Sequence, residues 1–218
     1  MKKLMNKKIL AGILASGALL ASGAASAIPT SCSSLTTLGA WASAGSCIDD
    51  DGDTTWTNTS TSSNISNAGL TFSENDISGL DTYTLHLDFS TFNNNSGFTG
   101  SGSLNYKVDP ILPSNEYFTN ASLSSTRGLL TGTSVVKDIS NASGAWSLTS
   151  TNANSDGPIA IYGQNIAVAE TFDAATTARL TGATNTYSVN VPEPGSILLL
   201  GIGLTGLVLG RKRMMHSV

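Results

Sequence analysis

The chain is predicted to contain an all-β domain, an antiparallel β-sandwich-like fold, over residues 28–190. Short stretches of this region alternate between apolar and polar residues, which is the pattern of strands that bury one face. Clusters of Asn, Ser and Gly separate these stretches, and such residues favour turns. No long stretch has the apolar period of a helix. Two packed antiparallel sheets are therefore the expected architecture.

Residues 1–27 have the layout of a secretory signal peptide. Its basic start contains Lys2, Lys3, Lys7 and Lys8. An apolar stretch follows over 9–20, and Ala25 and Ala27 place small side chains at the cleavage positions. We expect signal peptidase to cleave there, so that the mature chain begins at Ile28. The alternative, a retained N-terminal anchor, would need a longer apolar stretch.

The exported region is strongly acidic. The 218-residue chain has a formal charge of −4, but most of its basic side chains lie at its two ends. Residues 28–191 contain 4 basic and 14 acidic side chains, a net charge of −10. Nucleic-acid binding depends on Lys and Arg that neutralise phosphates, so nucleic acid is excluded as a partner.

Two cysteines, Cys32 and Cys47, lie in the exported region. An even number of cysteines in an oxidising compartment favours a disulfide, here one that closes a short loop. The alternative is a nucleophilic cysteine, which needs a neighbouring base. His86 is the only histidine of the exported region. We therefore predict a disulfide.

A run of acidic residues follows Cys47, and its carboxylates make it a weak candidate for a calcium site. The candidate ligands are Asp49, Asp51 and Asp53. An EF-hand is excluded, because Gly52 falls at loop position four instead of six and Ser60 occupies position twelve. A solvated acidic turn is the alternative, and no cofactor is expected.

The clearest strand pattern covers residues 83–89. One face would carry Tyr83, Leu85, Leu87 and Phe89. The opposite face would carry Thr84, His86 and Asp88, so His86 is expected to face solvent and not to act as a ligand or base.

Further strands are expected along the rest of the domain. They cover residues 104–108, 117–123, 134–139, 145–148, 159–162, 166–172 and 186–191. Turns are expected at 93–97 and 152–157, where Asn, Ser and Gly cluster. The stretch 172–180 contains enough Ala for one or two turns of helix.

The domain lacks the sequence motifs of common enzymes. It contains no Gly-x-Ser-x-Gly, no His-Glu-x-x-His and no cysteine–histidine set. Glu116 or Glu170 with an Asp could in principle form a glycosidase pair, but any acidic chain of this size offers such pairs. We expect the protein not to be an enzyme, with a secreted hydrolase as the disfavoured alternative.

Residues 191–213 begin with the tripeptide Pro192-Glu193-Pro194 and continue with an uncharged apolar run over 195–210. The two prolines fix an extended backbone that cannot enter a helix. The apolar run is about 24 Å long as a helix, at about 1.5 Å per residue. It is expected to cross a membrane where the bilayer thins locally.

A basic cluster, Arg211, Lys212 and Arg213, follows the apolar run. Basic residues beside a short apolar helix stay on the cytoplasmic side, which places the preceding chain outside. An ordinary C-terminal tail anchor and an apolar helix buried in a core are the alternatives to a specific signal.

The order of proline-flanked glutamate, apolar helix and basic cluster resembles the PEP-CTERM sorting signal of Gram-negative bacteria that make extracellular polysaccharide. The resemblance implies export through the Sec translocon and a transient inner-membrane anchor. It also implies processing near the tripeptide by exosortase, an integral-membrane cysteine protease-transpeptidase. The destination would be the cell surface or the extracellular matrix.

The segment 31–56 resembles an N-terminal block found in a recurring group of PEP-CTERM proteins. In that block a cysteine, a short helix-like Leu-rich stretch, Gly-x-Cys, an acidic turn and an aromatic residue follow one another. The matching residues are Cys32, Leu35, Leu38, Gly45, Cys47 and Trp56.

These observations predict an exported, non-enzymatic protein with a structural or adhesive role that exosortase sorts. The alternative is a surface module that binds polysaccharide or calcium.

Overall fold

The computed structural model describes residues 30–77, 80–111, 117–128 and 130–190. The expected signal peptide and the expected sorting signal, including its apolar run, lie outside these residues. Among the described residues, no helix has both the length and the apolar character that a membrane span requires.

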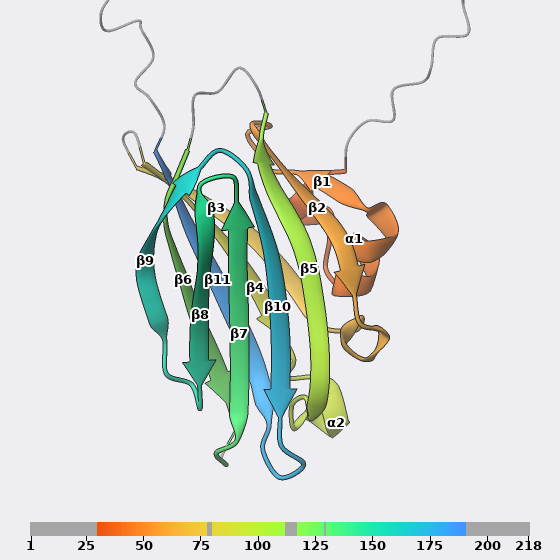
Figure 1. The fold of residues 1–218 in the computed structure, drawn as a ribbon. Coiled ribbons are helices and arrows are strands. Elements are labelled where there is room, and N and C mark those ends of the chain that lie inside the picture. Colours follow the sequence, from red (N-terminus) through yellow and green to blue (C-terminus); the bar gives the residue numbers. More distant parts are fainter. Residues whose placement is uncertain (1–29, 78–79, 112–116, 129, 191–218) are drawn as a thin grey trace, which may run out of the picture.

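The described residues form two antiparallel sheets packed face to face, which confirms the predicted all-β class (Figure 1). One sheet has six strands in the order β1-β2-β5-β10-β7-β8, and the other has five in the order β3-β4-β11-β6-β9. The strands are β1 (Ser46–Ile48), β2 (Thr54–Thr61), β3 (Gly69–Ile77), β4 (Leu80–Asp88), β5 (Gly100–Pro110), β6 (Tyr117–Arg127), β7 (Thr133–Asn141), β8 (Gly144–Thr151), β9 (Asp156–Gly163), β10 (Ile166–Ala174) and β11 (Leu180–Asn190).

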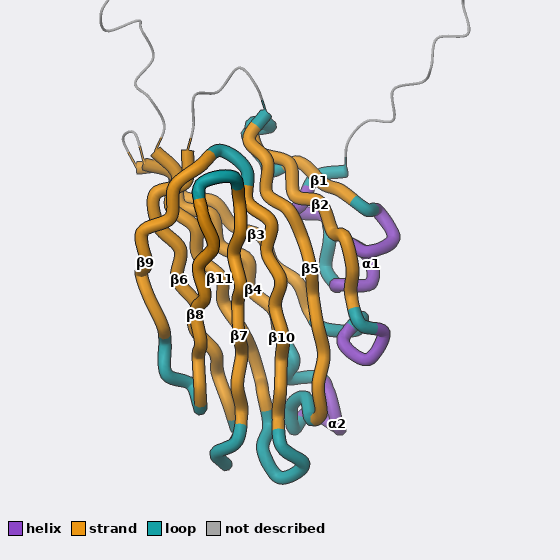
Figure 2. The backbone as a smooth tube through the Cα atoms, in the orientation of Figure 1, coloured by secondary structure: helices purple, strands orange, loops and turns teal. Residues whose placement is uncertain are grey.

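Helical structure in the described part is short and lies along the side of the sandwich formed by β1, β2 and β5 (Figure 2). The helices are α1 (Leu38–Ala44), α2 (Phe92–Asn95) and two 3₁₀ turns, Cys32–Ser34 and Ser63–Ile65. Thr37 caps α1 by accepting a hydrogen bond from the Ala40 amide, and Gly45 ends it with a positive φ of 76°. Buried Leu38 and Trp41 fix α1 against the core.

The predicted faces of residues 83–89 are confirmed. Tyr83, Leu85, Leu87 and Phe89 are buried. His86 lies on the other face, half-buried, where its Nδ1 is 2.8 Å from the Thr184 hydroxyl. The alternation of apolar and polar residues predicts the two faces correctly here, because one face of β4 packs against the opposite sheet.

The core is rich in aromatic rings that contact one another. Trp56 of β2 lies at its centre, with ring centroids of Phe72, Tyr83, Tyr106 and Tyr187 between 5.4 and 6.2 Å away. These side chains come from both sheets. The same cluster therefore holds the two layers together.

The expected turn clusters are confirmed, but the expected helical turns at 172–180 are wrong. Asn93, Asn94 and Asn95 have positive φ angles, which Asn tolerates better than most residues. By contrast, β10 continues to Ala174 and pairs with β5 and β7 on both sides. Phe172 and Ala174 both face the core, so tertiary packing overrides the helix propensity of Ala.

Candidate cation site

The acidic loop between β1 and β2 is organised by one carboxylate. Asp49 Oδ1 accepts hydrogen bonds from the backbone amides of Gly52, Asp53 and Thr54, at 3.2, 3.1 and 3.0 Å. Gly52 has a φ of 86°, which the tight loop requires and glycine allows. The other oxygen, Asp49 Oδ2, is buried and has no hydrogen-bond partner among the described residues.

A glutamate from another strand completes the cluster. Oxygen atoms of Asp49, Asp51, Asp53 and Glu74 lie within 4.8 Å of one another. Glu74 belongs to β3, and its Oε1 is also buried without a partner in the described part of the chain. The structure therefore brings the three sequence-predicted aspartates together and adds a fourth carboxylate that sequence reasoning missed.

The sequence contains one indication that Glu74 belongs to a site. In β3, Leu70 and Phe72 face inward, and Glu74 continues the same face at the next alternate position. A carboxylate in the inward-facing series of a strand is unusual unless it has a partner. Only the pairing of the strands shows that its partners are the aspartates of the β1–β2 loop.

A second acidic group shares Glu74. One oxygen each from Glu74, Asp76 and Asp81 lies within the same 4.8 Å limit. Asp76 of β3 is directly opposite Asp81 of β4. Asp81 is only 8% exposed, so this second group extends the acidic cluster toward the interior of the sheet.

The pKa values of these carboxyl groups are strongly raised. Burial is the largest cause, and repulsion from neighbouring carboxylates adds to it. The pKa rises to about 7 for Asp49, to about 9 for Glu74 and to about 6 for Asp81. No cationic side chain of the described chain is among the groups that shift them. The cluster must therefore take up protons or hold a cation.

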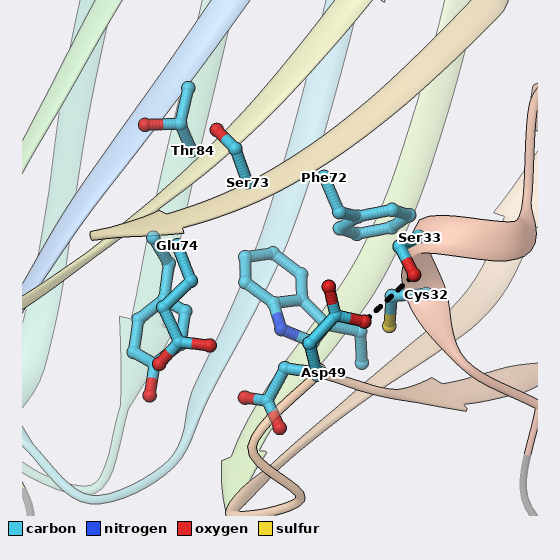
Figure 3. Close-up of a pocket in the computed structure, with 10 residues that line it drawn as sticks. Cys32, Ser33, Asp49, Phe72, Ser73, Glu74 and Thr84 are labelled. Carbon is cyan, nitrogen blue, oxygen red and sulfur yellow. Dashed lines mark hydrogen bonds between the residues drawn. The ribbon is translucent and has the colours of Figure 1, made fainter. Parts of the chain in front are cut away.

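The walls of the site are fixed by apolar packing and hydrogen bonds. Figure 3 shows Asp49 and Glu74 reaching the same pocket from different elements, with Phe72 on its apolar side. The Tyr83 hydroxyl donates to Asp53 Oδ1 at 3.1 Å. At the outer margin, Ser31 and Ser33 donate to Asp50 Oδ1, which lowers the pKa of Asp50. Asp50 thus differs in environment from the clustered carboxylates.

The predicted disulfide is present beside this pocket. Cys32 and Cys47 are bonded, with an S–S distance of 2.05 Å, and both are buried. The bond joins the first 3₁₀ turn to β1 and so anchors the start of the acidic loop. No free thiol is present among the described residues, which rules out the nucleophilic-cysteine alternative for this pair.

The carboxylates of this site have the chemistry of a hard-cation site. Calcium takes 6 to 8 oxygen ligands in flexible geometry, and water commonly completes the set. The four ligands come from the β1–β2 loop and from β3, so the site is unlike an EF-hand, as its spacing indicates. Asp49, Asp51, Asp53 and Glu74 are the residues that would hold the ion, with Asp76 and Asp81 beside them.

The other sequence-predicted site residues lie outside the described part of the chain. They are Ala25 and Ala27 of the signal peptide, and Pro192, Glu193, Pro194, Arg211, Lys212 and Arg213 of the sorting signal. The acidic cluster nevertheless lies near the start of the sorting signal, because Asp81 pairs with Val189 close to the end of β11.

The described all-β domain ends where a C-terminal motif begins, at Asn190 of β11. The particular signal is identified by a family model, the PEP-CTERM protein-sorting motif, which matches residues 190–213. The chain therefore carries a PEP-CTERM sorting motif, as the sequence resemblance predicts. The motif implies that exosortase is its processing partner and that it is an exported, membrane-anchored precursor sorted to the cell surface.

Solved structures with detectable similarity are distant. TmCBM61, solved with β-1,4-galactotriose, has a TM-score of 0.28 and 10% identity, covering 56% of this chain and 88% of its own. Peruvianin-I, a cysteine peptidase from Thevetia peruviana latex, has a TM-score of 0.23 and 16% identity, covering 67% and 66%. A point mutant of the oxalate decarboxylase OxdC from Bacillus subtilis has a TM-score of 0.18 and 9% identity, covering 54% and 27%.

These likenesses are too low to assign a function. Among curated proteins, none matches the chain.

Proposed function

We propose that this protein is an exosortase-processed structural or adhesive component of the cell surface or extracellular matrix, without enzymatic activity. The observation that carries the proposal is the PEP-CTERM motif over residues 190–213. In this proposal the Sec translocon exports the chain, signal peptidase removes residues 1–27, and the inner membrane holds the precursor transiently.

The position of the motif relative to the fold supports this proposal. The motif begins at Asn190, which is also the last residue of β11. β11 lies between β4 and β6 and forms the middle strand of its sheet. Processing near Pro192–Pro194 would therefore remove the C-terminal segment and leave every strand in place, so the released domain keeps its fold.

The chemistry of the described domain also supports a structural role. Glu170, one of the carboxylates considered for a glycosidase pair, is completely enclosed in the core, so a soluble sugar cannot reach it. His86 bonds to Thr184 on a strand face. Glu116 lies outside the described residues. Glu170 is therefore not accessible to a substrate in solution, and His86 is held on the strand face by Thr184.

Intact-mass analysis of the protein from the cell surface or medium tests the sorting. In cells with exosortase, the expected product begins at Ile28 and ends near Pro192. Cells without exosortase, and the Glu193→Ala variant, should retain the C-terminus in the inner membrane. Asp138→Ala, a matched change at an exposed strand position, should be processed normally. Unchanged processing in the absence of exosortase would overturn the proposal.

A second candidate function is divalent-cation binding at the acidic cluster. The specific observation is that Asp81 is nine-tenths buried beside the cluster and that Asp49 Oδ2 and Glu74 Oε1 have no hydrogen-bond partner in the described structure. Burying carboxylates without a counter-charge costs several kcal/mol, and a hard cation removes this cost. A bound ion would cross-link the acidic loop to β3.

Calcium titration by calorimetry tests the second function. Binding of calcium to the chelator-treated protein is expected, and Glu74→Gln should weaken it about tenfold or more. The matched control Asp138→Asn, on the exposed face of β7, should bind as the wild type does. If no heat of binding is measured at millimolar calcium, the carboxylates are neutralised by protons alone and the proposal of a cation site is wrong.

Polysaccharide binding is a separate proposal at the surface. The large aromatic rings around Trp56 are buried, whereas Tyr162 of β9 is 60% exposed. Glycan-array binding with and without chelator, for the wild type and Tyr162→Ala, distinguishes a sugar-binding surface from a purely structural one. Loss of signal with chelator would connect the sugar to the acidic cluster, and loss with Tyr162→Ala would connect it to β9.

A further inference from the structure

Three polar side chains from three strands meet inside the sandwich. Lys137 of β7, Glu170 of β10 and Asn185 of β11 each have 0% exposure. Lys and Glu are rarely fully buried, and each needs a compensating partner when they are. The three residues therefore require a physical explanation beyond packing.

Lys137 and Glu170 are neighbours in one sheet, where they lie directly opposite each other in the β7–β10 pairing. Glu170 Oε1 accepts a hydrogen bond from the Tyr106 hydroxyl at 2.7 Å. Lys137 Nζ instead donates to the backbone oxygen of Ser122 at 2.6 Å, and it lies 4.4 Å from the centroid of the Tyr187 ring. The lysine amine thus extends across the core to the opposite sheet.

The place that the amine reaches is next to Asn185. Ser122 of β6 pairs with Thr186 of β11, and the adjacent pair is Leu123 with Asn185. Asn185 and Tyr187 are alternate residues of β11, and both face inward. The lysine amine is therefore bonded at the residue pair that is next to the Leu123–Asn185 pair.

Asn185 itself is unsatisfied. Neither polar atom of its amide has a hydrogen-bond partner in the described structure, and Glu170 Oε2 has none either. The Asn185 amide is nevertheless close enough to the Glu170 carboxyl to offset part of the rise that burial causes in the pKa of Glu170. Buried unsatisfied groups are rare in native proteins, so these three atoms require a physical explanation.

Burial shifts both members of the pair toward their uncharged forms. Burial lowers the pKa of Lys137 to about 8 and raises the pKa of Glu170 above its usual range. A neutral lysine amine is a nucleophile, and a neutral carboxylic acid can donate a proton.

We propose that Lys137 and Asn185 form an intramolecular isopeptide bond that covalently joins the two sheets, with Glu170 transferring the protons. The Nζ lone pair attacks Cγ of Asn185, and Glu170 donates a proton as negative charge develops on the amide oxygen. The Glu170 carboxylate then takes a proton from Nζ and delivers it to Nδ2. The Cγ–Nδ2 bond breaks and one ammonia leaves, while the proton on the former amide oxygen returns to the Glu170 carboxylate. A secondary amide remains, with no oxidant, reductant or co-reactant needed.

The fold supplies what this reaction requires. The amine and the amide are held on rigid strands of opposite sheets. The reaction is therefore intramolecular, and the entropy cost of bringing the two groups together is already met by folding. Apolar residues and rings surround the three groups and exclude the water that would otherwise hydrolyse the amide. The product amide places an N–H and a C=O beside the Glu170 carboxyl, and so gives the unsatisfied oxygen a donor.

Tryptic peptide mapping of the purified full-length protein tests the bond. The sequence between Arg127 and Arg179 contains one tryptic site, Lys137, and no Lys or Arg lies between Arg179 and Arg211. The expected product is a branched species in which 128–179, uncut at Lys137, is joined to the peptide that begins at Leu180. Its mass should equal the two peptides minus one ammonia. Recovery of linear 128–137 together with an unmodified Asn185 peptide would overturn the proposal.

Variants separate the reaction from folding. Glu170→Gln keeps nucleophile, electrophile and side-chain shape, and is expected to fold but to yield the linear peptides. Lys137→Met should do the same, and Lys107→Met, at an exposed position of β5, should retain the branched species. Circular dichroism confirms that each variant is folded. If Glu170→Gln fails to fold, Asn185→Ala replaces it, and a branched species in any folded variant that lacks Lys137 or Asn185 would contradict the assignment.

Discussion

Glu74 shows how one residue can change the response of the whole domain to pH. In the metal-free protein the pKa values of Glu74, Asp49 and Asp81 are raised above the values of the unfolded chain. Between about pH 4 and pH 9 these three groups therefore bind more protons in the native state than in the unfolded state, so their contribution to stability falls as pH rises.

We accordingly predict that, with chelator present, the midpoint of urea unfolding is lower at pH 8.5 than at pH 5. Excess calcium should raise the midpoint at pH 8.5 and have little effect at pH 5, because protons occupy the site in acid. Glu74→Gln should reduce the pH dependence, and Asp138→Asn should leave it unchanged. An unfolding midpoint that rises with pH in chelator would contradict the prediction.

Trp56 is the residue on which packing of the core depends most. It is 2% exposed and contacts rings from both sheets. Trp56→Ala should lower the free energy of unfolding by about 3–5 kcal/mol, because the cavity cannot close without moving strands. Chemical denaturation checks this. The half-buried Trp146 provides the comparison, since Trp146→Ala should cost clearly less, and equal losses would contradict the central role of Trp56.

The disulfide acts on one element, the short strand β1. β1 has three residues, pairs with β2 and has one further bridge, between Ile48 and Ser31, so its hydrogen bonds alone hold it weakly. Replacing both Cys32 and Cys47 by Ser opens a loop with a sequence separation of 15 and should lower stability by about 3 kcal/mol.

Hydrogen exchange gives the sharper measurement of this change. In the Cys32→Ser/Cys47→Ser variant, exchange should accelerate in β1 and the acidic loop while β10 and β11 remain protected. Calcium affinity should fall in parallel, because the loop carries three of the four clustered carboxylates. Uniform acceleration across both sheets would show instead that the bond supports the whole core.

At the scale of elements, the sequence predicts strands well where one face is buried and the other is not. Residues 83–89 and 104–108 satisfy this condition and are correct. β2 was missed because it lies in the N-terminal block, where turn residues and Thr dilute the apolar period. The stretch 172–180 misled because Ala is small enough for a strand interior as well as for a helix.

At the scale of the whole molecule, strand order could not be predicted, because pairing depends on contacts far apart in sequence. The candidate cation site shows the consequence. Asp49, Asp51 and Asp53 are visible as a run, but Glu74 joins them only through packing of β3 beside the loop. The group of Lys137, Glu170 and Asn185 is still harder to predict from the sequence, since each of the three occurs alone in an alternating strand.

The isopeptide bond would link β7 of one sheet to β11 of the other, and β11 leads directly to the sorting motif. It closes a loop of roughly 50 residues, which in the chain-entropy model is worth about 4 kcal/mol. For a domain of this size that corresponds to a melting temperature higher by about 10 °C.

The triple variant Lys137→Met/Glu170→Met/Asn185→Leu tests this contribution with the fewest side effects. It removes the bond together with all three buried polar groups, so that no carboxyl group is left buried without Lys137, and replacing a buried ion pair or triad by apolar residues is often neutral or stabilising. We therefore predict that its melting temperature, measured by calorimetry with the disulfide intact, is lower than that of the wild type by about 10 °C. A melting temperature equal to or above the wild-type value would mean that the two sheets are held together by packing alone.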